Sequence, residues 1–371
     1  MKLLIERTNL LKSLGHMQSV VERRNTIPIL SNVKLNAEES SLSLNATDLD
    51  VEISEKISAN ISSSGATTAP AHTLYEIVRK LPEGSQVELN ATSDSQLALS
   101  AGRFQTTLSC LPIIDFPVMG SDSFDVVFQI SANNLRDLID RTKFAISTEE
   151  TRYYLNGIYL HIAEANSEKL MRAVATDGHR LASFEVPMPK GAADMPGIIL
   201  PRKTITELRK LIDEIDASIE ISVSENKIQL TFNQVILISK LIDGTFPDYQ
   251  RVIPNNNDQI LEIDRRSLTE AVDRVSAISN EKSRAVKLNV SNNKLILEAF
   301  SPDHGSATEE VEANYSGTNI EIGFNSAYLM DIARQIKTEN INISMADAAS
   351  PTIFRESSGG PTLYVLMPMR V

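Results

Sequence analysis

The sequence has little of what marks a secreted, membrane-bound or metal-based protein. It has one cysteine, Cys110, in 371 residues, which excludes an intrachain disulfide and fits a reducing cytosol. Tryptophan is absent, but a hydrophobic fraction of 42% is enough for ordinary cores. The apolar run at residues 3–5 meets Glu6 and Arg7 at once, which is too short for a signal peptide, and no later run approaches a membrane span. We therefore expect a cytoplasmic globular protein with no membrane partner.

Short repeated segments indicate that the chain is one unit written three times. Residues 46–50 (Ala-Thr-Asp-Leu-Asp) are echoed 129 positions later by residues 175–179 (Ala-Thr-Asp-Gly-His), and residues 301–305 (Ser-Pro-Asp-His-Gly) supply a third copy. Phe116-Pro117 recurs 130 positions later as Phe246-Pro247. The length suits two or three domains, and turn-rich stretches at 119–123 and 254–258 offer boundaries. We predict three similar domains over residues 1–122, 123–254 and 255–371.

Hydrophobic periodicity gives each third the same plan. A strand, a helix and three strands follow one another, and the series then repeats within the domain. The helical windows are residues 10–24, 73–81, 134–146, 201–212, 265–278 and 327–337. This pattern predicts an α+β fold of three repeated domains, each made of two βαβββ halves, with the helices on one side and the sheets outside.

The distribution of charge matters more than its total. The net charge is −12, which alone argues against a nucleic-acid partner, yet the six helical windows hold 17 basic and 8 acidic residues. The windows therefore carry +9 and the rest of the chain −21. Lysine and arginine favour helices anyway, but glutamate favours them equally. A shared helical face would be basic and would attract a polyanion by its phosphates, without reading bases. No zinc, helix-turn-helix or aromatic-interleaved basic signature is evident.

The turn at residues 176–180 carries the most chemistry in one place. Asp177-Gly178 is a hairpin signal, and His179 and Arg180 follow it directly. One interpretation is a polar hairpin tip, and another is a hydrolase that uses Asp177 and His179. A metal site would need a second His or carboxylate at ligand spacing, and a hydrolase would need a nucleophile in a fixed context. Neither is evident, so the sequence assigns no catalytic residue, metal or cofactor.

Taken together, these segments resemble those of the bacterial DNA polymerase III β subunit family, the DNA sliding clamps. The resemblance covers all three predicted domains. It rests on residues 25–32 (Asn-Thr-Ile-Pro-Ile-Leu-Ser-Asn), 152–157 (Arg-Tyr-Tyr-Leu-Asn-Gly), 175–181, 244–249 (Gly-Thr-Phe-Pro-Asp-Tyr), 279–282 (Ser-Asn-Glu-Lys) and 366–370 (Leu-Met-Pro-Met-Arg). It implies a head-to-tail homodimer that closes a ring around duplex DNA, with helices lining the hole and sheets on the rim. Such a ring is a processivity factor that slides without sequence specificity and has no catalytic site.

The resemblance also implies a groove between the second and third domains that binds peptide motifs. The expected partners are the replicative polymerase, the clamp loader, and other polymerases and repair proteins. Carried over by motif, the groove residues are Leu155, Thr176, Gly178, His179, Arg180, Leu181, Pro247, Arg251, Val252, Val365, Met367, Pro368, Met369 and Arg370. Methionine suits a surface that must accept several partners, and the arginines could meet a peptide's backbone or carboxylates. The alternative for the C-terminal run is a final strand that docks into its own domain.

Candidate DNA contacts come partly from the resemblance and partly from the helical windows. Arg24, Tyr153 and Tyr154 match family positions at the lumen. The windows add Arg79, Lys80, Arg141, Lys143, Arg202, Lys203, Arg209 and Lys210. Glu149 and Glu150 precede the tyrosine pair and depart from what a phosphate contact favours.

The subunit interface is expected to pair two strand edges across the seam. We predict that residues 104–108 of the first domain meet residues 294–300 of the third, with Phe104, Leu108, Ile278 and Leu297 in the interface. Pairing would close edges that otherwise invite aggregation. The rival to a DNA-encircling clamp is a tandem-repeat scaffold that never meets nucleic acid.

Overall fold

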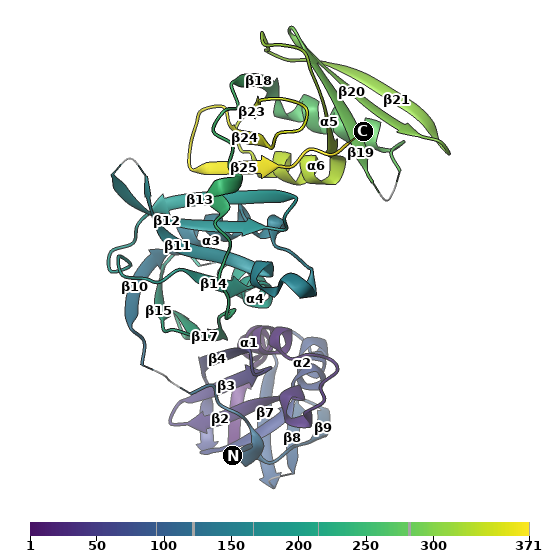
Figure 1. Cartoon of the computed structure of the whole chain (residues 1–371). Coiled ribbons are helices and arrows are strands. Elements are labelled where there is room, and N and C mark those ends of the chain that lie inside the picture. Colours follow the sequence, from purple (N-terminus) through teal and green to yellow (C-terminus); the bar gives the residue numbers. More distant parts are fainter. Residues whose placement is uncertain (94, 121–122, 166, 214, 281–282, 371) are drawn as a thin grey trace. The chain divides into compact units, whose positions relative to one another are not determined.

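The computed structural model describes residues 1–371 except 94, 121–122, 166, 214, 281–282 and 371. The chain forms two compact units (Figure 1). Unit 1 comprises Met1–Asn133, Pro189–Met195 and Lys203–Leu241, and unit 2 comprises Asn134–Met188, Pro196–Arg202 and Ile242–Val371. The predicted boundary at 119–123 includes residues 121–122, which lie outside the described residues.

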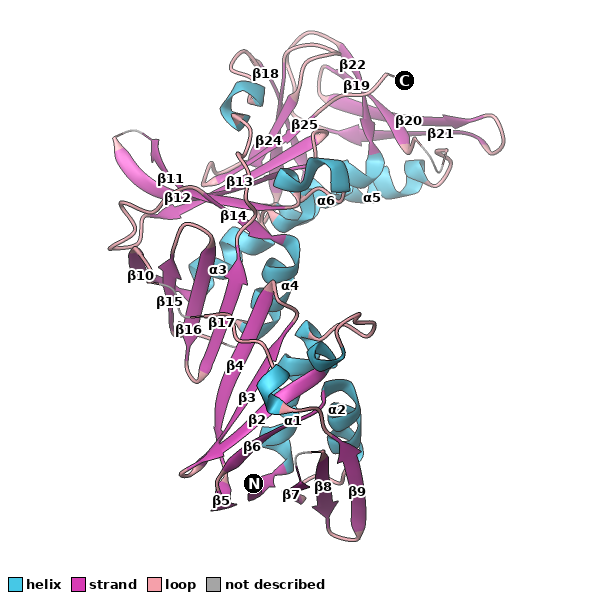
Figure 2. Cartoon of the chain, turned by 60° about the horizontal axis from the view of Figure 1, so that its bottom comes forward, coloured by secondary structure: helices cyan, strands magenta, loops and turns pink. Residues whose placement is uncertain are grey.

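Unit 1 contains two antiparallel sheets, in the strand orders β5-β1-β7-β8-β9 and β10-β15-β16-β17-β4-β3-β2-β6. Its strands are β1 (Lys2–Glu6), β2 (Asn32–Glu38), β3 (Ser41–Thr47), β4 (Val51–Ser58), β5 (Asn60–Ser63), β6 (Gly65–Pro70), β7 (Gln86–Ser93), β8 (Gln96–Ala101), β9 (Phe104–Ser109), β10 (Val126–Ser131), β15 (Ser218–Val223), β16 (Lys227–Phe232) and β17 (Val235–Lys240). Its helices are α1 (Arg7–Val20), α2 (Ala71–Lys80) and α4 (Arg202–Leu211), with short 3-10 turns η1 (Pro28–Ser31) and η2 (Ile113–Asp115). Helices α1 and α2 lie side by side (Figure 2).

Unit 2 is built in the same way, with strand orders β14-β11-β12-β13-β25-β24-β23-β18 and β21-β20-β19-β22. Its strands are β11 (Gly157–Ala165), β12 (Glu168–Thr176), β13 (Arg180–Pro187), β14 (Ile198–Pro201), β18 (Gln259–Asp264), β19 (Ala285–Ser291), β20 (Lys294–Ser301), β21 (Gly305–Glu312), β22 (Ile320–Asn325), β23 (Asn340–Met345), β24 (Thr352–Glu356) and β25 (Thr362–Leu366). Its helices are α3 (Ala132–Asp140), α5 (Arg265–Ser276) and α6 (Ser326–Gln335), with 3-10 turns η3 (Lys143–Ala145), η4 (Glu150–Leu155) and η5 (Tyr249–Val252). Helices α5 and α6 also lie side by side (Figure 2).

Local sequence explains most of these elements. In α5, Leu268, Ala271, Val272 and Val275 recur at helical spacing and are all buried. Asp264 caps this helix by accepting a hydrogen bond from the Ser267 N–H at 2.7 Å. Strands such as β16 and β23 alternate buried and partly exposed residues. The predicted α+β fold is confirmed.

The helices end earlier than predicted. The window at 134–146 ends as a helix at Asp140, and a 3-10 turn follows at η3. The six α-helices hold 13 basic and 7 acidic residues. Their excess of positive charge is therefore +6 rather than +9. Five cations and Glu22 lie beyond the helix ends, and Arg7 is gained at the start of α1; the five cations are Arg23, Arg24, Arg141, Lys143 and Lys337.

The first two repeated segments adopt the same turn. Gly178 donates its N–H to the Thr176 hydroxyl (3.1 Å), and the N–H groups of His179 and Arg180 both bind Asp177 Oδ1 (2.9 and 3.0 Å). In unit 1 the matching donors are Leu49 to Thr47 (3.0 Å), and Asp50 and Val51 to Asp48 Oδ1 (2.9 and 2.7 Å). The third copy joins β20 to β21. The sequence echoes therefore mark one hairpin of a repeated unit.

The edges of the sheets correct the predicted interface. Strand β9 is an edge strand, as predicted, and Phe104 on it is 43% exposed. Strand β20, however, is paired on both sides, with β19 and with β21, and Leu297 on it is fully buried. Leu297 is therefore a core residue, and the strand at this end of the sheet is β21. Alternation alone identified β20 as a strand but could not show its neighbours.

Candidate functional site

An apolar cluster lies beneath the turn at residues 176–180. We call it the groove cluster, and it consists of Leu155, Val174, Leu181, Ile199, Phe246, Tyr249, Ile353 and Val365. The final strand completes it, because β25 pairs with β13 and places Val365 opposite Leu181. Three predicted groove residues, Leu155, Leu181 and Val365, are thus buried in this cluster. Tyr154, predicted to contact DNA, packs against the same cluster.

The C-terminal segment after β25 is held at two points. The Met367 N–H donates to His179 O at 2.9 Å, and the Met369 N–H donates to Gly323 O at 2.9 Å. The Met367 side chain remains 41% exposed, and Val252 is 47% exposed. Exposed apolar side chains beside a buried apolar floor form a surface that can accept a partner's apolar groups. Pro368, Met369 and Arg370 line a cavity of about 670 Å³, which Gly323 also lines.

Thr176 and Gly178 shape the turn. The Thr176 hydroxyl donates to Arg180 O at 2.7 Å, which fixes the two ends of the turn together. Gly178 has φ 88°, and a Cβ at this position would lie 2.7 Å from Arg152 Nη1. Glycine adopts this φ without strain, and a larger residue here would have to displace the end of the Arg152 side chain.

Arg180, predicted to meet a peptide, is engaged by partners within the protein. Its guanidinium binds Asp177 Oδ2 at 3.1 Å and Asp331 Oδ2 at 2.6 Å, and donates to Phe144 O at 2.7 Å. It also stacks over the Tyr328 ring at 4.3 Å. Only 10% of this side chain is exposed. Arg180 therefore fastens the groove turn to helix α6, while Arg251, 83% exposed and paired with Asp248, and the exposed Arg370 remain at the surface.

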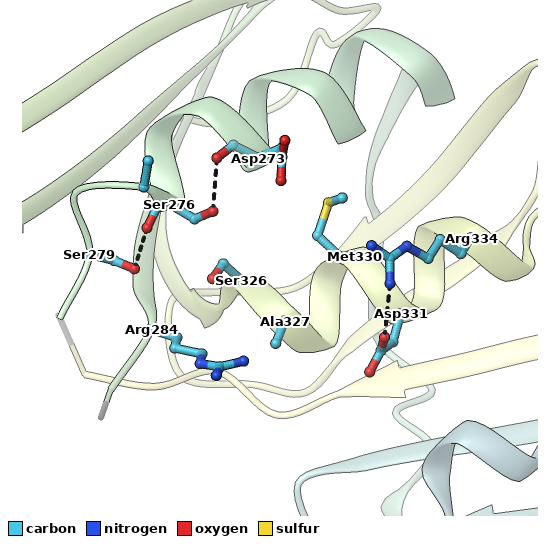
Figure 3. Close-up of a pocket in the computed structure, with 10 residues that line it drawn as sticks. Asp273, Ser276, Ser279, Arg284, Ser326, Ala327, Met330, Asp331 and Arg334 are labelled. Atoms are coloured by element: carbon cyan, nitrogen blue, oxygen red, sulfur yellow. Dashed lines mark hydrogen bonds and ion pairs between the residues drawn. The ribbon is translucent and has the colours of Figure 1, made fainter. Parts of the chain in front are cut away.

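Helix α6 also lines a second feature of unit 2, a cavity of about 800 Å³ between α5 and α6 (Figure 3). Asp273 and Ser276 come from α5, and Ala327, Met330 and Arg334 come from α6. Asp331 belongs to this cavity and to the Arg180 network at once. One helix thus supports the turn on one side and bounds an open polar cleft on the other.

Several predicted DNA contacts are exposed and only locally paired. Side chains of Arg79, Lys80, Lys143 and Lys210 are 45% to 74% exposed, and each pairs with an acid three or four positions away. Arg209 pairs with Asp213 in the same way. Such surface pairs are worth little and can be exchanged for phosphate contacts. Arg24 and Tyr153 are exposed as well.

Two predicted contacts are not surface cations. Arg141 is 5% exposed, and its guanidinium binds Gln335 O and, at 3.1 Å, Glu356 Oε1. Lys203 bridges Asp48 and Glu22, and its partial burial is outweighed by these hydrogen bonds, which raise its pKa. Arg141 is therefore removed from the DNA-facing set. Arg202 is the first residue of α4 and also interacts with other groups of the protein.

The acids beside the tyrosine pair are partly offset. Glu149 Oε2 lies 2.6 Å from Arg152 Nη2, so that carboxylate is neutralised within its own turn.

The motif at 279–282 includes residues 281–282, which lie outside the described residues. Ile278, predicted for the interface, is partly buried at the end of α5, and Leu108 is buried on β9.

A buried polar network supports one wall of the groove, and sequence reasoning missed it. Arg172 pairs with Glu185 and donates from Nη1 to the Tyr249 hydroxyl at 2.8 Å. Tyr249 in turn lies 3.1 Å from His161 Nε2, and the His161 ring stacks on Tyr159 at 4.5 Å. Because Tyr249 belongs to the groove cluster, this network fixes the position of the segment at 244–252. The members are far apart in sequence, so no motif signals them.

His161 makes stability depend on pH. Burial, with the nearby Arg172 charge, lowers its pKa from 6.5 to about 4. The unfolded chain therefore takes up a proton near pH 6.5, while the folded protein resists protonation down to about pH 4. Stability is present above pH 6.5 and is lost as the pH falls through this window, by on the order of 2–3 kcal/mol. In His161→Phe, which keeps the stack on Tyr159, urea unfolding should show a shallower loss over pH 6.5–4. An unchanged slope would contradict the assignment.

The turn lacks the parts of a hydrolase. The Asp177 carboxylate accepts hydrogen bonds from its own turn and from Arg180, and His179 stacks on Tyr328. Within the described ranges, no group of three or more His, Cys, Asp and Glu side chains is arranged to hold a metal. No helix among the residues described has the length and apolar character needed to cross a bilayer.

Comparison with known proteins defines the class, which is that of the sliding clamps. Residues 1–120, 129–248 and 250–370 match the N-terminal, central and C-terminal domains of the DNA polymerase III beta subunit. The beta sliding clamps of Caulobacter vibrioides NA1000 and Escherichia coli K12 are 52% and 37% identical over 372 residues, covering 100% of each chain. A DnaN sliding clamp from Bartonella birtlesii, solved bound to griselimycin, is 49% identical with a TM-score of 0.98, covering 100% of both chains.

The chain belongs to the DNA polymerase III beta subunit family. Proteins of this family are processivity factors that tether the replicative polymerase to DNA, and they are accessory subunits without catalysis of their own. The three matches in order also explain the repeated turn. The hydrolase and scaffold interpretations are therefore set aside.

Proposed function

We propose that two copies of this chain close a ring around duplex DNA in the cytoplasm, with domains over residues 1–122, 123–254 and 255–371. Strand β9 is an edge strand of a sheet in unit 1, and strand β21 is an edge strand of a sheet in unit 2. Strand β21 carries Glu309, Glu310 and Glu312, and Arg103 precedes β9. Opposite charge and unpaired backbone groups favour a head-to-tail joint between these edges.

The groove cluster and the C-terminal segment form the proposed site for linear peptides. The observation that carries this is the tail itself, which pairs with His179 and Gly323 and leaves Met367 exposed beside a buried floor. Methionine side chains adapt to several ligands. We infer that the replicative polymerase, the clamp loader, and other polymerases and repair proteins insert short apolar motifs here and compete for it.

DNA contact is proposed to be loose and electrostatic. Phosphate contacts position a protein without reading sequence, and their strength falls with salt. The cations that support this are the exposed Arg24, Arg79, Lys80, Lys143 and Lys210 and the half-buried Arg209. Tyr153, 54% exposed, could pack against the sugar–phosphate backbone from η4.

Neutralising two of these cations should weaken DNA binding in a salt-dependent way. In Arg24→Ala/Lys80→Ala, the slope of log K against log salt on duplex DNA should fall by about two. The reason is that each lost phosphate contact releases about one counterion fewer. Lys2→Ala, which removes a half-exposed lysine from strand β1, is the matched control and should leave the slope unchanged. Equal slopes in all three proteins would argue for a scaffold that does not use DNA.

A further inference from the structure

The groove turn has a counterpart in unit 1 that the proposed function leaves unused. Strand β4 pairs with β17 as β13 pairs with β25, with Val51 opposite Ser239 and Arg180 opposite Leu366. The next residue repeats the match, because the Lys240 N–H donates to Asp50 O at 2.9 Å as Met367 donates to His179. Lys240 therefore stands in unit 1 where Met367 stands in unit 2.

An apolar cluster accompanies this second turn. Ile29, Leu30 and Phe116 are buried together, with Leu49 and Leu111 packed against them. Phe116 lies 130 positions before Phe246 of the groove cluster, and a proline follows each. The same turn, the same strand pairing and an aromatic at the same place thus occur in both units.

Large apolar side chains around this second cluster are exposed. The exposed fractions are 46% for Ile27, 36% for Ile113, 90% for Ile114 and 63% for Val118. Ile27 precedes η1, which supplies Ile29 and Leu30, while the other three flank Phe116 in the chain. We call Ile27, Leu49, Ile113, Ile114 and Val118 the unit 1 patch. Apolar side chains gathered in this way mark an interaction surface.

The patch cannot take the ligand of the groove. Glu52 replaces Leu181 on the strand after the turn, is 5% exposed, and accepts hydrogen bonds from Asn45 (3.0 Å) and from the Met119 N–H (2.8 Å). Leu49 replaces Gly178 and keeps φ at 78°, a conformation that leucine rarely adopts. Its side chain packs against the cluster, which offsets the strain. The buried residues beneath the patch thus include a carboxylate, that of Glu52. Leu49 also places a side chain where Gly178 has none in unit 2.

Charge indicates what the patch prefers. The exposed Arg23 and Arg24 lie just before Ile27 in the chain. Two of the nearby acids, Glu22 and Asp48, are bound by Lys203, while Asp115, next to Ile114, is exposed. Lys240 likewise holds Asp50 at 3.0 Å. The exposed charges that remain are those of Arg23 and Arg24 against that of Asp115, so the net positive charge favours an acidic ligand.

We propose that the unit 1 patch docks a short peptide segment of a partner protein in which apolar side chains are flanked by acidic ones. The apolar side chains cover Ile114 and Val118, and the acids face Arg23 and Arg24. The proposal rests on the proposed function, since the partner is one that acts on the same DNA, but it needs no occupancy of the groove.

The test is selection of a displayed library of random 12-residue peptides on the full-length protein. Binders are then sorted with Ile114→Asp, Met367→Asp and Val127→Asp, the last an equally apolar side chain, 52% exposed, on β10. We expect one class, apolar and acidic, that loses about tenfold or more in affinity with Ile114→Asp. This class should also weaken with Arg24→Glu and should ignore the Met367 and Val127 changes. Because Ile114 is 90% exposed, circular dichroism should show the same melting temperature for Ile114→Asp and the parent.

The proposal would be overturned if every binder depended on Met367, or if no binder lost affinity with Ile114→Asp. The proposal would also be overturned if the parent protein formed an assembly larger than a dimer and Ile114→Asp reduced its mass. The patch would then bind another copy of this chain. Absence of any Met367-dependent class would instead contradict the proposed groove, so the two failures are distinguishable.

Discussion

Removal of the residues after Leu366 should abolish peptide binding and leave the dimer intact. The removed segment carries Met367 and Met369, whose N–H groups pin it to His179 and Gly323; its last residue, Val371, lies outside the described residues. Loss of two central apolar anchors should weaken a labelled polymerase-derived peptide on the order of a hundredfold in fluorescence anisotropy. Strand β25 ends at Leu366, so the sheet that it shares with β13 should persist.

The control separates a lost site from a lost fold. Met367→Leu keeps the apolar surface and the backbone hydrogen bond to His179, so its affinity should stay within a few-fold of the parent. Dissociation of the truncated protein into single chains would contradict the placement of the tail away from the subunit joint. An unchanged peptide affinity would contradict the groove.

Phe104→Glu should convert the dimer to single chains at micromolar concentration. Phe104 is 43% exposed on the free edge β9, and the proposed partner edge β21 already carries Glu309, Glu310 and Glu312. A new carboxylate removes apolar contact and adds like-charge repulsion, which together should weaken the dimer by about a hundredfold or more. Sedimentation equilibrium measures the change.

Phe104→Arg is the matched variant, because it loses the same ring but adds the opposite charge. It should weaken the dimer less than Phe104→Glu does. Val127→Glu, on β10, should leave the mass of two chains unchanged. Equal effects of glutamate and arginine would remove the charge argument, and a stable dimer in both would place the joint elsewhere.

Local pattern predicted the elements well, because each helix and strand of this chain carries its own periodicity. Leu268, Ala271, Val272 and Val275 specify α5 without help from distant residues. The repeated turn was visible because an Asp followed by a positive-φ position binds its own backbone. Such hydrogen bonds depend on residues three positions apart or fewer, which a sequence displays directly.

Long-range partners could not be predicted in this way. Arg180 and Asp331 are 151 positions apart, and Arg141 and Glu356 are 215 apart, so neither arginine could be recognised as internal. Leu297 was misplaced because alternation shows that β20 is a strand but not that β21 covers its edge. His161 was missed since a single histidine in a strand gives no pattern until Tyr249 lies beside it.

The central claim is that the protein holds DNA by encircling it, and cutting a loaded circle tests this most directly. The protein is loaded onto a nicked circular DNA at raised salt, and a restriction enzyme then opens the circle once. We predict that it stays on the circle and runs off as soon as the DNA is linear. Equal retention on circular and linear DNA would contradict the account.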